Sequence, residues 1–120
     1  MRTSNRRQLA TPDLAATLLT SATRTGAWQI GQDTHIDDDD ATPRCIIAAP
    51  KGYTTRQALA RAHRMVASIY ESIGEEIAWV PRALPHAMHD RCALVLIEGC
   101  ADDELVEAKR LLSQAARKAT

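Results

Sequence analysis

Three side chains of metal-ligand type lie close together just before a long apolar run. His86, His89 and Cys92 fall within seven positions, and neutral imidazole and thiolate are ligands that zinc prefers. A closed zinc site needs four ligands, and only His35 or the aspartates at 37–40 could complete this one. Because the set is incomplete, we favour a solvated loop beside a core cysteine and expect no cofactor. A metal-assisted hydrolase built on the two histidines is kept as an alternative hypothesis.

A second candidate site is the strand-to-helix turn "APKGYTTRQA". Free backbone N–H groups and the positive end of a helix favour an anion at such a turn. The residues that would hold it are Lys51, Gly52, Thr54, Thr55 and Arg56. The spacing does not match the G-x-x-x-x-G-K-[ST] loop that wraps nucleotide phosphates. Plain helix capping by Thr54 and Gln57 is the alternative interpretation.

Basic side chains raise the further hypothesis of nucleic-acid binding. The candidates are Arg2, Arg6 and Arg7 near the amino terminus and Arg61 and Arg64 on the long helix. RNA-binding domains of ferredoxin-like fold stack bases on aromatic residues of the two central strands. Neither "RCIIAA" nor "CALVLI" contains an aromatic residue, so the sequence argues against that mode of binding.

Cys100 is the only nucleophile whose position suggests catalysis. It follows an apolar strand and precedes a helix, and a helix amino terminus can lower the pKa of a thiol. Asp102 and Asp103 oppose this effect, and no histidine is evident in the sequence as its base. We therefore assign no catalytic residue and expect a protein that is not an enzyme.

Length and composition predict one globular domain. The 120 residues suit a single domain over residues 11–120, preceded by a flexible basic arm at residues 1–10. Fifteen basic and fifteen acidic residues balance, so any attraction to a polyanion must be local. No segment has the roughly 20 apolar residues of a membrane span or the core of a signal peptide. We expect a cytoplasmic protein with no membrane partner, and three cysteines argue against a disulfide framework.

Local signals predict three helices and four strands. Thr11 and Pro12 begin a helix that ends before Gly26, and the capping box of Thr54 and Gln57 begins a helix over residues 55–73. A third helix begins at the acidic residues after Ala101. The expected strands are residues 27–32, 45–49, 76–80 (ended by Pro81) and 92–98.

The hydrophobic pattern predicts how these strands pair. The strands 45–49 and 92–98 are apolar without alternation and should be central. If the helix 55–73 carries the chain across so that these two strands lie parallel, the sheet order is 27–32, 45–49, 92–98, 76–80. The prediction is an α/β (α+β) fold with a four-stranded mixed sheet. Its topology, α-β-β-α-β-β-α, is a circular permutation of the ferredoxin-like arrangement.

Both faces of the central strands are apolar. Ile46, Ala48, Leu94 and Leu96 oppose Cys45, Ile47, Val95 and Ile97. The two long helices cover one face, and the helix 12–25, about 10 Å wide, would span about two strands of the other. We therefore expect a homodimer to cover the remainder.

By elimination, the leading hypothesis is a small non-enzymatic binding or regulatory module that works through a protein interface. Its size is common among bacterial and mobile-element accessory proteins. The alternative is a domain that binds an anionic small ligand or nucleic acid through Lys51–Arg56 and the basic arm.

Overall fold

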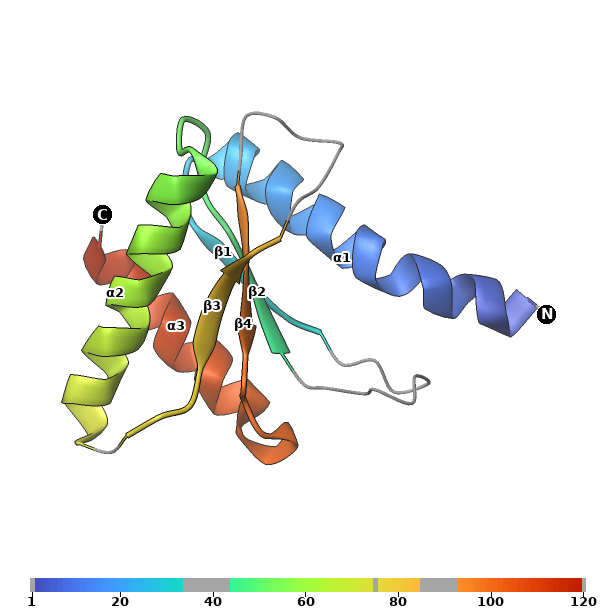
Figure 1. Ribbon diagram of the computed structural model, residues 1–120. Helices are drawn as coiled ribbons and strands as arrows, with labels where there is room; N and C mark the ends of the chain where they lie inside the picture. Colours follow the sequence, from blue (N-terminus) through green and yellow to red (C-terminus); the bar gives the residue numbers. More distant parts are fainter. Residues whose placement is uncertain (1, 34–43, 75, 85–92, 120) are drawn as a thin grey trace.

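The fold is a four-stranded sheet between two helical layers. The computed structural model describes residues 2–33, 44–74, 76–84 and 93–119, with side chains described from residue 14 except at 33, 44, 102 and 119. The elements are α1 (Arg2–Thr25), β1 (Gln29–Asp33), β2 (Arg44–Ala48), α2 (Thr55–Ile73), β3 (Val80–Ala83), β4 (Leu94–Glu98), η1 (Asp102–Glu104) and α3 (Leu105–Ala119). Figure 1 shows α2 and α3 on one side of the sheet and α1 on the other. The predicted α+β fold and its element order are confirmed.

The sheet has the predicted strand order, β1-β2-β4-β3, but not the predicted strand directions. Every neighbouring pair is antiparallel, so the expectation that the two central strands run parallel in a mixed sheet is wrong. Arg44 and Val80, the first residues of β2 and β3, both lie opposite Glu98. The crossover through α2 therefore makes β2 and β3 run the same way, and β4 folds back between them.

The edge strand β3 lies further along the chain than predicted. It covers Val80–Ala83 and includes Pro81, which we expected to end a strand over residues 76–80. Proline lacks a backbone N–H, but an edge strand needs hydrogen bonds on one side only. The ladder continues past the strand, because the Leu84 N–H donates to the Leu94 carbonyl.

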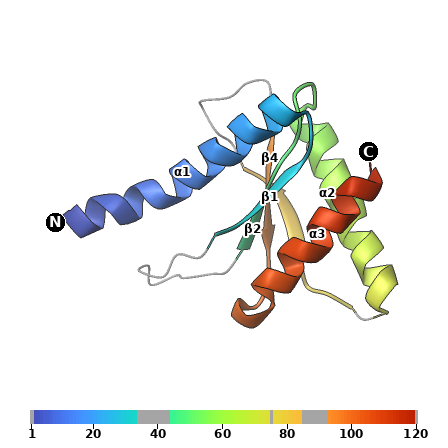
Figure 2. The same cartoon turned by 180° about the vertical axis from the view of Figure 1, so that it is seen from behind.

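Helix α1 is longer than predicted at its amino-terminal end. It begins at Arg2 and passes through Pro12, so the predicted start at Pro12 is wrong. Residues 2–11 are rich in good helix formers, which offsets the one backbone hydrogen bond that proline removes. Figure 2 shows this half of α1 projecting beyond the sheet. That residues 1–10 form a flexible arm stays a prediction.

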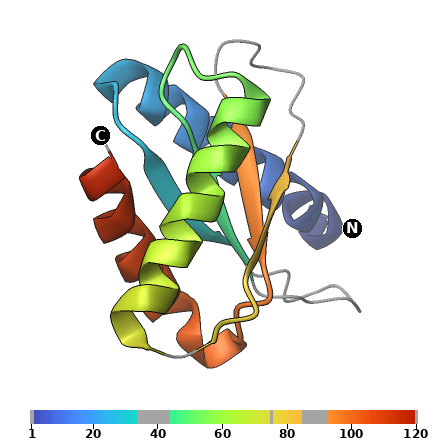
Figure 3. The same ribbon diagram turned by 60° about the vertical axis from the view of Figure 1, so that its left-hand side comes forward.

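The two faces of the sheet have separate cores, divided as the alternation predicts. The face toward α2 and α3 buries Cys45, Ile47, Val95 and Ile97. The face toward α1 buries Ile46, Ala48, Leu94 and Leu96 against Ala15, Leu18, Leu19 and Ala22. Figure 3 shows α2 crossing in front of the sheet with α1 behind it.

One chain covers the face toward α1 as far as β4. Leu94 and Leu96 lie on β4, which is the third strand of the sheet counted from β1. They are still only 2% and 5% exposed. The expected open width of two strands is therefore reduced to β3, whose Val80 and Arg82 lie on this face and are exposed. The homodimer stays a prediction. Among the described helices, none has an apolar stretch long enough to cross a membrane.

Helix α2 has the bounds that its capping signals predict. The Gln57 N–H donates to Thr54 Oγ1 (3.1 Å), and the Thr54 N–H donates to Gln57 Oε1 (3.0 Å). Gly74 ends the helix in the left-handed region, with φ of +71°. This rigid start of α2 positions the residues of the candidate site.

Candidate functional site: two basic pockets

Most charges of the described residues are segregated, although the chain has no net charge; Arg82 and Arg110 are exceptions, because they pair with Glu98 and Glu107. Residues 14–32, 41–70 and 108–120 contain no Asp or Glu. The end of α1, the start of α2 and the end of α3 lie toward one end of the sheet (Figure 3). We call this end the cationic pole; its described basic residues are Arg24, Lys51, Arg56, Arg61, Arg64, Arg117 and Lys118. The opposite, acidic pole has Glu71, Glu76, Glu98, Asp103, Glu104 and Glu107.

The first pocket lies at the cationic pole, between the turn before α2 and one face of that helix. Its volume is about 490 Å³, and it is lined by Lys51, Gly52, Tyr53, Gln57, Ala60, Arg61 and Arg64. The helical residues recur at steps of three and four, so they share one face of α2. Among the described residues that line it, three are cationic and none is acidic, which favours the binding of an anion.

The first pocket joins residues from two of the predicted sites. Lys51 and Gly52 come from the predicted anion turn, and Arg61 and Arg64 come from the predicted nucleic-acid set. Thr55 and Arg56 do not line it, and Thr54 is occupied in the capping box. The cap satisfies one helical N–H, so the side-chain cations of the wall carry more of the attraction than the helix end does.

The second pocket lies between β1 and α3. Its volume is about 350 Å³, and it is lined by Ala27, Trp28, Gln29, Ile30, Lys109, Ser113, Ala116 and Arg117. Lys109, Ser113 and Ala116 recur at steps of four and three, so they share one face of α3. This lining also combines cations with an aromatic ring and uncharged hydrogen-bonding groups, and none of its described residues carries a carboxylate.

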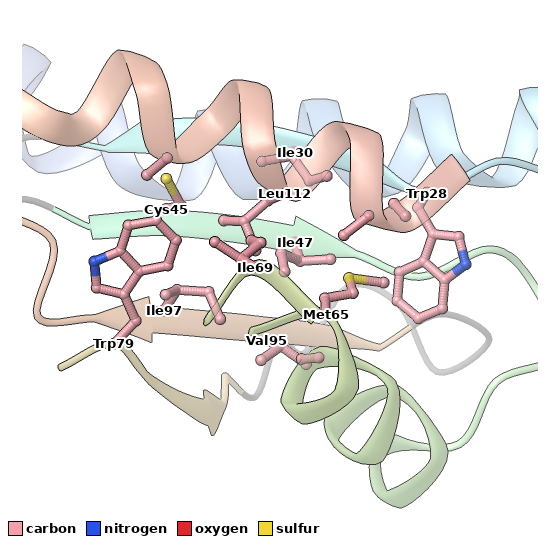
Figure 4. Close-up of a cluster of buried hydrophobic side chains, with 14 of the residues drawn as sticks. Trp28, Ile30, Cys45, Ile47, Met65, Ile69, Trp79, Val95, Ile97 and Leu112 are labelled. Atoms are coloured by element: carbon pink, nitrogen blue, oxygen red, sulfur yellow. The ribbon is translucent and has the colours of Figure 1, made fainter. Parts of the chain in front are cut away.

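An aromatic pair joins the two pockets. The ring centroids of Trp28, which lines the second pocket, and Tyr53, which lines the first, lie 4.9 Å apart. The rings meet edge to face at 66°, a favourable geometry for two aromatic quadrupoles. Figure 4 shows Trp28 and Trp79 at opposite ends of one buried cluster. Trp79 Nε1 donates to Glu104 Oε1 at the acidic pole (3.2 Å).

Trp28 differs from Trp79 in its hydrogen bonding. Trp28 Nε1 is buried and has no hydrogen-bond partner among the residues that the structure describes. A buried donor without a partner costs free energy, so Trp28 is held in place by packing and by its contact with Tyr53.

Tyr53, Trp28, Lys109 and Arg117 are site residues that the sequence analysis missed. A signal was present, because residues 41–70 and 108–120 both lack acidic side chains. The remaining predicted residues, Arg2, Arg6 and Arg7, belong to the start of α1, whose side chains lie outside the described set. In Figure 1 this end of α1 lies on the far side of the sheet from α2, so the fold does not bring it to the pockets.

The predicted metal site cannot be placed in the fold, because His86, His89 and Cys92 lie outside the described residues. Within the described ranges, no three His, Cys, Asp or Glu side chains come together as metal ligands.

The structure brings Cys100 beside Cys45, and both are buried free cysteines. Their hydrogen bond lowers the pKa of Cys45 and raises that of Cys100, which burial and the charge of Glu104 raise further. A raised thiol pKa does not favour a nucleophile at Cys100.

No family model, no curated protein and no solved structure matches this chain. The two pockets themselves indicate the kind of ligand. Lysine and arginine side chains attract anions, and the planar guanidinium group binds phosphate oxygens in pairs. The arrangement can therefore hold a phosphate-bearing ligand.

Proposed function

We propose that the chain is a non-enzymatic module that binds a phosphate-bearing anionic ligand in the first pocket. The observation that supports this proposal is that Lys51, Arg61 and Arg64 line one pocket, with no carboxylate among the described residues of its wall. The volume of about 490 Å³ also suits a small ligand, since such sites commonly enclose about 300–1,000 Å³.

The physical argument is the addition of three positive charges over a small concave surface. One pair of unit charges 4 Å apart gains about 1 kcal/mol in water and more near a protein surface. Lys51 and Arg64 are exposed, so salt screens their attraction. The affinity for phosphate-bearing ligands should therefore fall as the salt concentration rises.

The test is thermal unfolding of the whole chain with pyrophosphate as the probe. A ligand at 100 times its Kd stabilises the folded state by about 2.7 kcal/mol, which raises the Tm by several degrees. The variant Lys51→Ala with Arg64→Ala should lose this rise in Tm. The matched control is Arg110→Ala with Lys118→Ala, which removes the same charge outside the pocket and should keep it. No rise in Tm of the unmodified chain, or an equal rise in both double variants, would overturn the proposal.

A second candidate function is binding of another protein, and one observation at the acidic pole favours it. Tyr70, Ile73 and Val80 are large apolar residues that are 41–55% exposed. Ile73 also lines a groove of about 380 Å³, together with Glu76, Ile77, Ala78, Trp79, Gly99, Glu104, Glu107 and Leu111. Exposed apolar residues and a groove with a polar rim are typical of an interface.

The partner in this second candidate is another protein or a second copy of the chain. We keep with it the cytoplasmic location and the bacterial or mobile-element setting that the sequence suggests. The test is a pull-down from a bacterial lysate. A partner that binds the unmodified chain stoichiometrically and does not bind the Ile73→Asp variant would support this candidate. Light scattering at high micromolar concentration tests the homodimer. A monomer in solution together with an empty pull-down would rule the candidate out.

A further inference from the structure

We infer that the ligand of the cationic pole is a single-stranded nucleic acid that occupies both pockets. This inference rests on the proposed function, because it takes the first pocket as a phosphate site. It adds the second pocket, which the sequence did not predict. The two pockets have the same chemistry: each combines an aromatic ring, at least two cations and an uncharged hydrogen-bonding side chain, and no carboxylate is among the described residues that line either.

The repeated chemistry matches a repeated ligand. Proteins that bind single strands combine a basic groove along the backbone with aromatic rings beside the bases. Lys51, Arg61 and Arg64 would bind phosphates on one side of the Trp28–Tyr53 pair. Lys109 and Arg117 would bind them on the other side, where Gln29 and Ser113 can donate and accept hydrogen bonds. A single phosphate group can contact only one pocket, whereas consecutive nucleotides can contact both.

The Trp28–Tyr53 pair separates the nucleotide that would occupy the first pocket from the nucleotide that would occupy the second. Its ring centroids are 4.9 Å apart, so the pockets are separated by little more than these two side chains. Adjacent units of one strand can lie on either side of such a wall.

The fold also distinguishes a single strand from the other forms of nucleic acid. Ferredoxin-like RNA-binding domains use the face of the sheet, but here α2 and α3 cover one face and α1 covers the other. The bases of a duplex are stacked inside it and cannot enter two concave pockets without being unpaired. The unpaired bases of a single strand can enter them directly.

The first part of the experiment measures fluorescence anisotropy of a labelled ten-nucleotide oligo-dT with the whole chain. We expect binding that weakens with salt, because each phosphate that a cation neutralises releases counterions. The same sequence as a duplex, and inorganic polyphosphate of similar length, should compete at least tenfold less well than unlabelled oligo-dT. Equal competition by either of them would overturn the inference, since the pockets would then bind any polyanion.

The second part separates the two pockets. Lys109→Ala with Arg117→Ala should weaken oligonucleotide binding at least tenfold, because the second pocket loses both of its described cations. The matched control, Arg110→Ala with Lys118→Ala, removes the same charge from the same helix outside both pockets and should weaken oligonucleotide binding less than threefold. Circular dichroism and Tm show whether each variant is folded.

The outcomes of these experiments distinguish failure of the inference from failure of the proposed function. One outcome is that pyrophosphate binds to the unmodified chain while the Lys109 and Arg117 double variant binds the oligonucleotide with the same affinity as the control variant. In that case the inference is wrong, and the proposed anion pocket is still supported. If pyrophosphate does not bind to the unmodified chain, the proposed function fails first. Loss of oligonucleotide binding in both double variants to the same extent would show an effect of overall charge, and would also overturn the inference.

Discussion

Gly99 is the residue at which one added carbon atom should disturb this fold most. It follows β4 with φ of +97°, in the region that favours glycine. A Cβ atom built there would lie 2.3 Å from the carbonyl oxygen of Ala78 and 3.1 Å from its carbonyl carbon. Both are backbone atoms and cannot rotate away as a flexible side chain would. Gly99→Ala must therefore shift the segment before β3 or the turn after β4.

Gly52 is a control with the same backbone conformation and no close neighbour. Its φ is +102°, and a Cβ atom there would meet nothing within 4 Å. Holding an L-residue at such a φ costs about 1–3 kcal/mol. Overpacking adds typically about 1–3 kcal/mol. We expect Gly52→Ala to lower the free energy of unfolding by about 1–3 kcal/mol, the cost of the backbone conformation alone. Gly99→Ala should lower it by the cost of the backbone conformation and the cost of overpacking together.

Urea unfolding followed by circular dichroism measures this difference. Both variants should keep the slope m of the unmodified chain, so that a lower midpoint reports a lower stability of the folded state. Gly74→Ala, at φ of +71° with open space around it, should behave like Gly52→Ala. If Gly99→Ala and Gly52→Ala lose the same free energy within about 0.5 kcal/mol, the close approach of Gly99 to Ala78 is refuted.

Three further predictions test the cap, the second core and the cysteines. Thr54→Ala should lower the free energy of unfolding by about 1 kcal/mol in urea, whereas Thr54→Ser, which keeps the hydroxyl, should change it little. Leu96→Ala should lower it by about 2–5 kcal/mol, with a Tm that does not depend on protein concentration, because Leu96 is buried within one chain. Cys45 and Cys100 are both buried, so in a Cys92→Ser variant of the chain they should not react with a water-soluble disulfide reagent while the protein is folded. They should react in urea. Rapid reaction of the folded protein would contradict this prediction.

The parts of the fold that sequence predicts here are those set by neighbouring residues. The bounds of α2 follow from Thr54, Gln57 and Gly74, which act within one turn of the helix. The division of the two central strands between two cores follows from strict alternation, because successive side chains of a strand point to opposite faces. The sheet order follows in turn from which strands are apolar on both faces.

The parts that sequence does not predict depend on distant segments. The direction of β4 beside β2 is decided by the chain reversal between β3 and β4, and the strand pattern is the same in either direction. Pro81 fits into β3 only because that strand lies at the edge of the sheet. The pocket between β1 and α3 forms from residues about 80 positions apart, such as Trp28 and Lys109, which no local spacing connects.

The neutral net charge does not argue against a polyanionic ligand once the charges are placed in space. Arg56 and Glu71 lie fifteen residues apart on α2, which is about 22 Å along the helix at 1.5 Å per residue. The Debye length at physiological ionic strength is about 8 Å, so exposed carboxylates at that distance are largely screened from the cationic pole. A ligand at the first pocket therefore interacts with the local cations Lys51, Arg61 and Arg64 rather than with the net charge of the chain. The composition excludes only an attraction of polyanions by the net charge of the whole molecule. The fold creates a local positive potential, because it brings the end of α1, the start of α2 and the end of α3, which lack acidic residues, to the same end of the sheet.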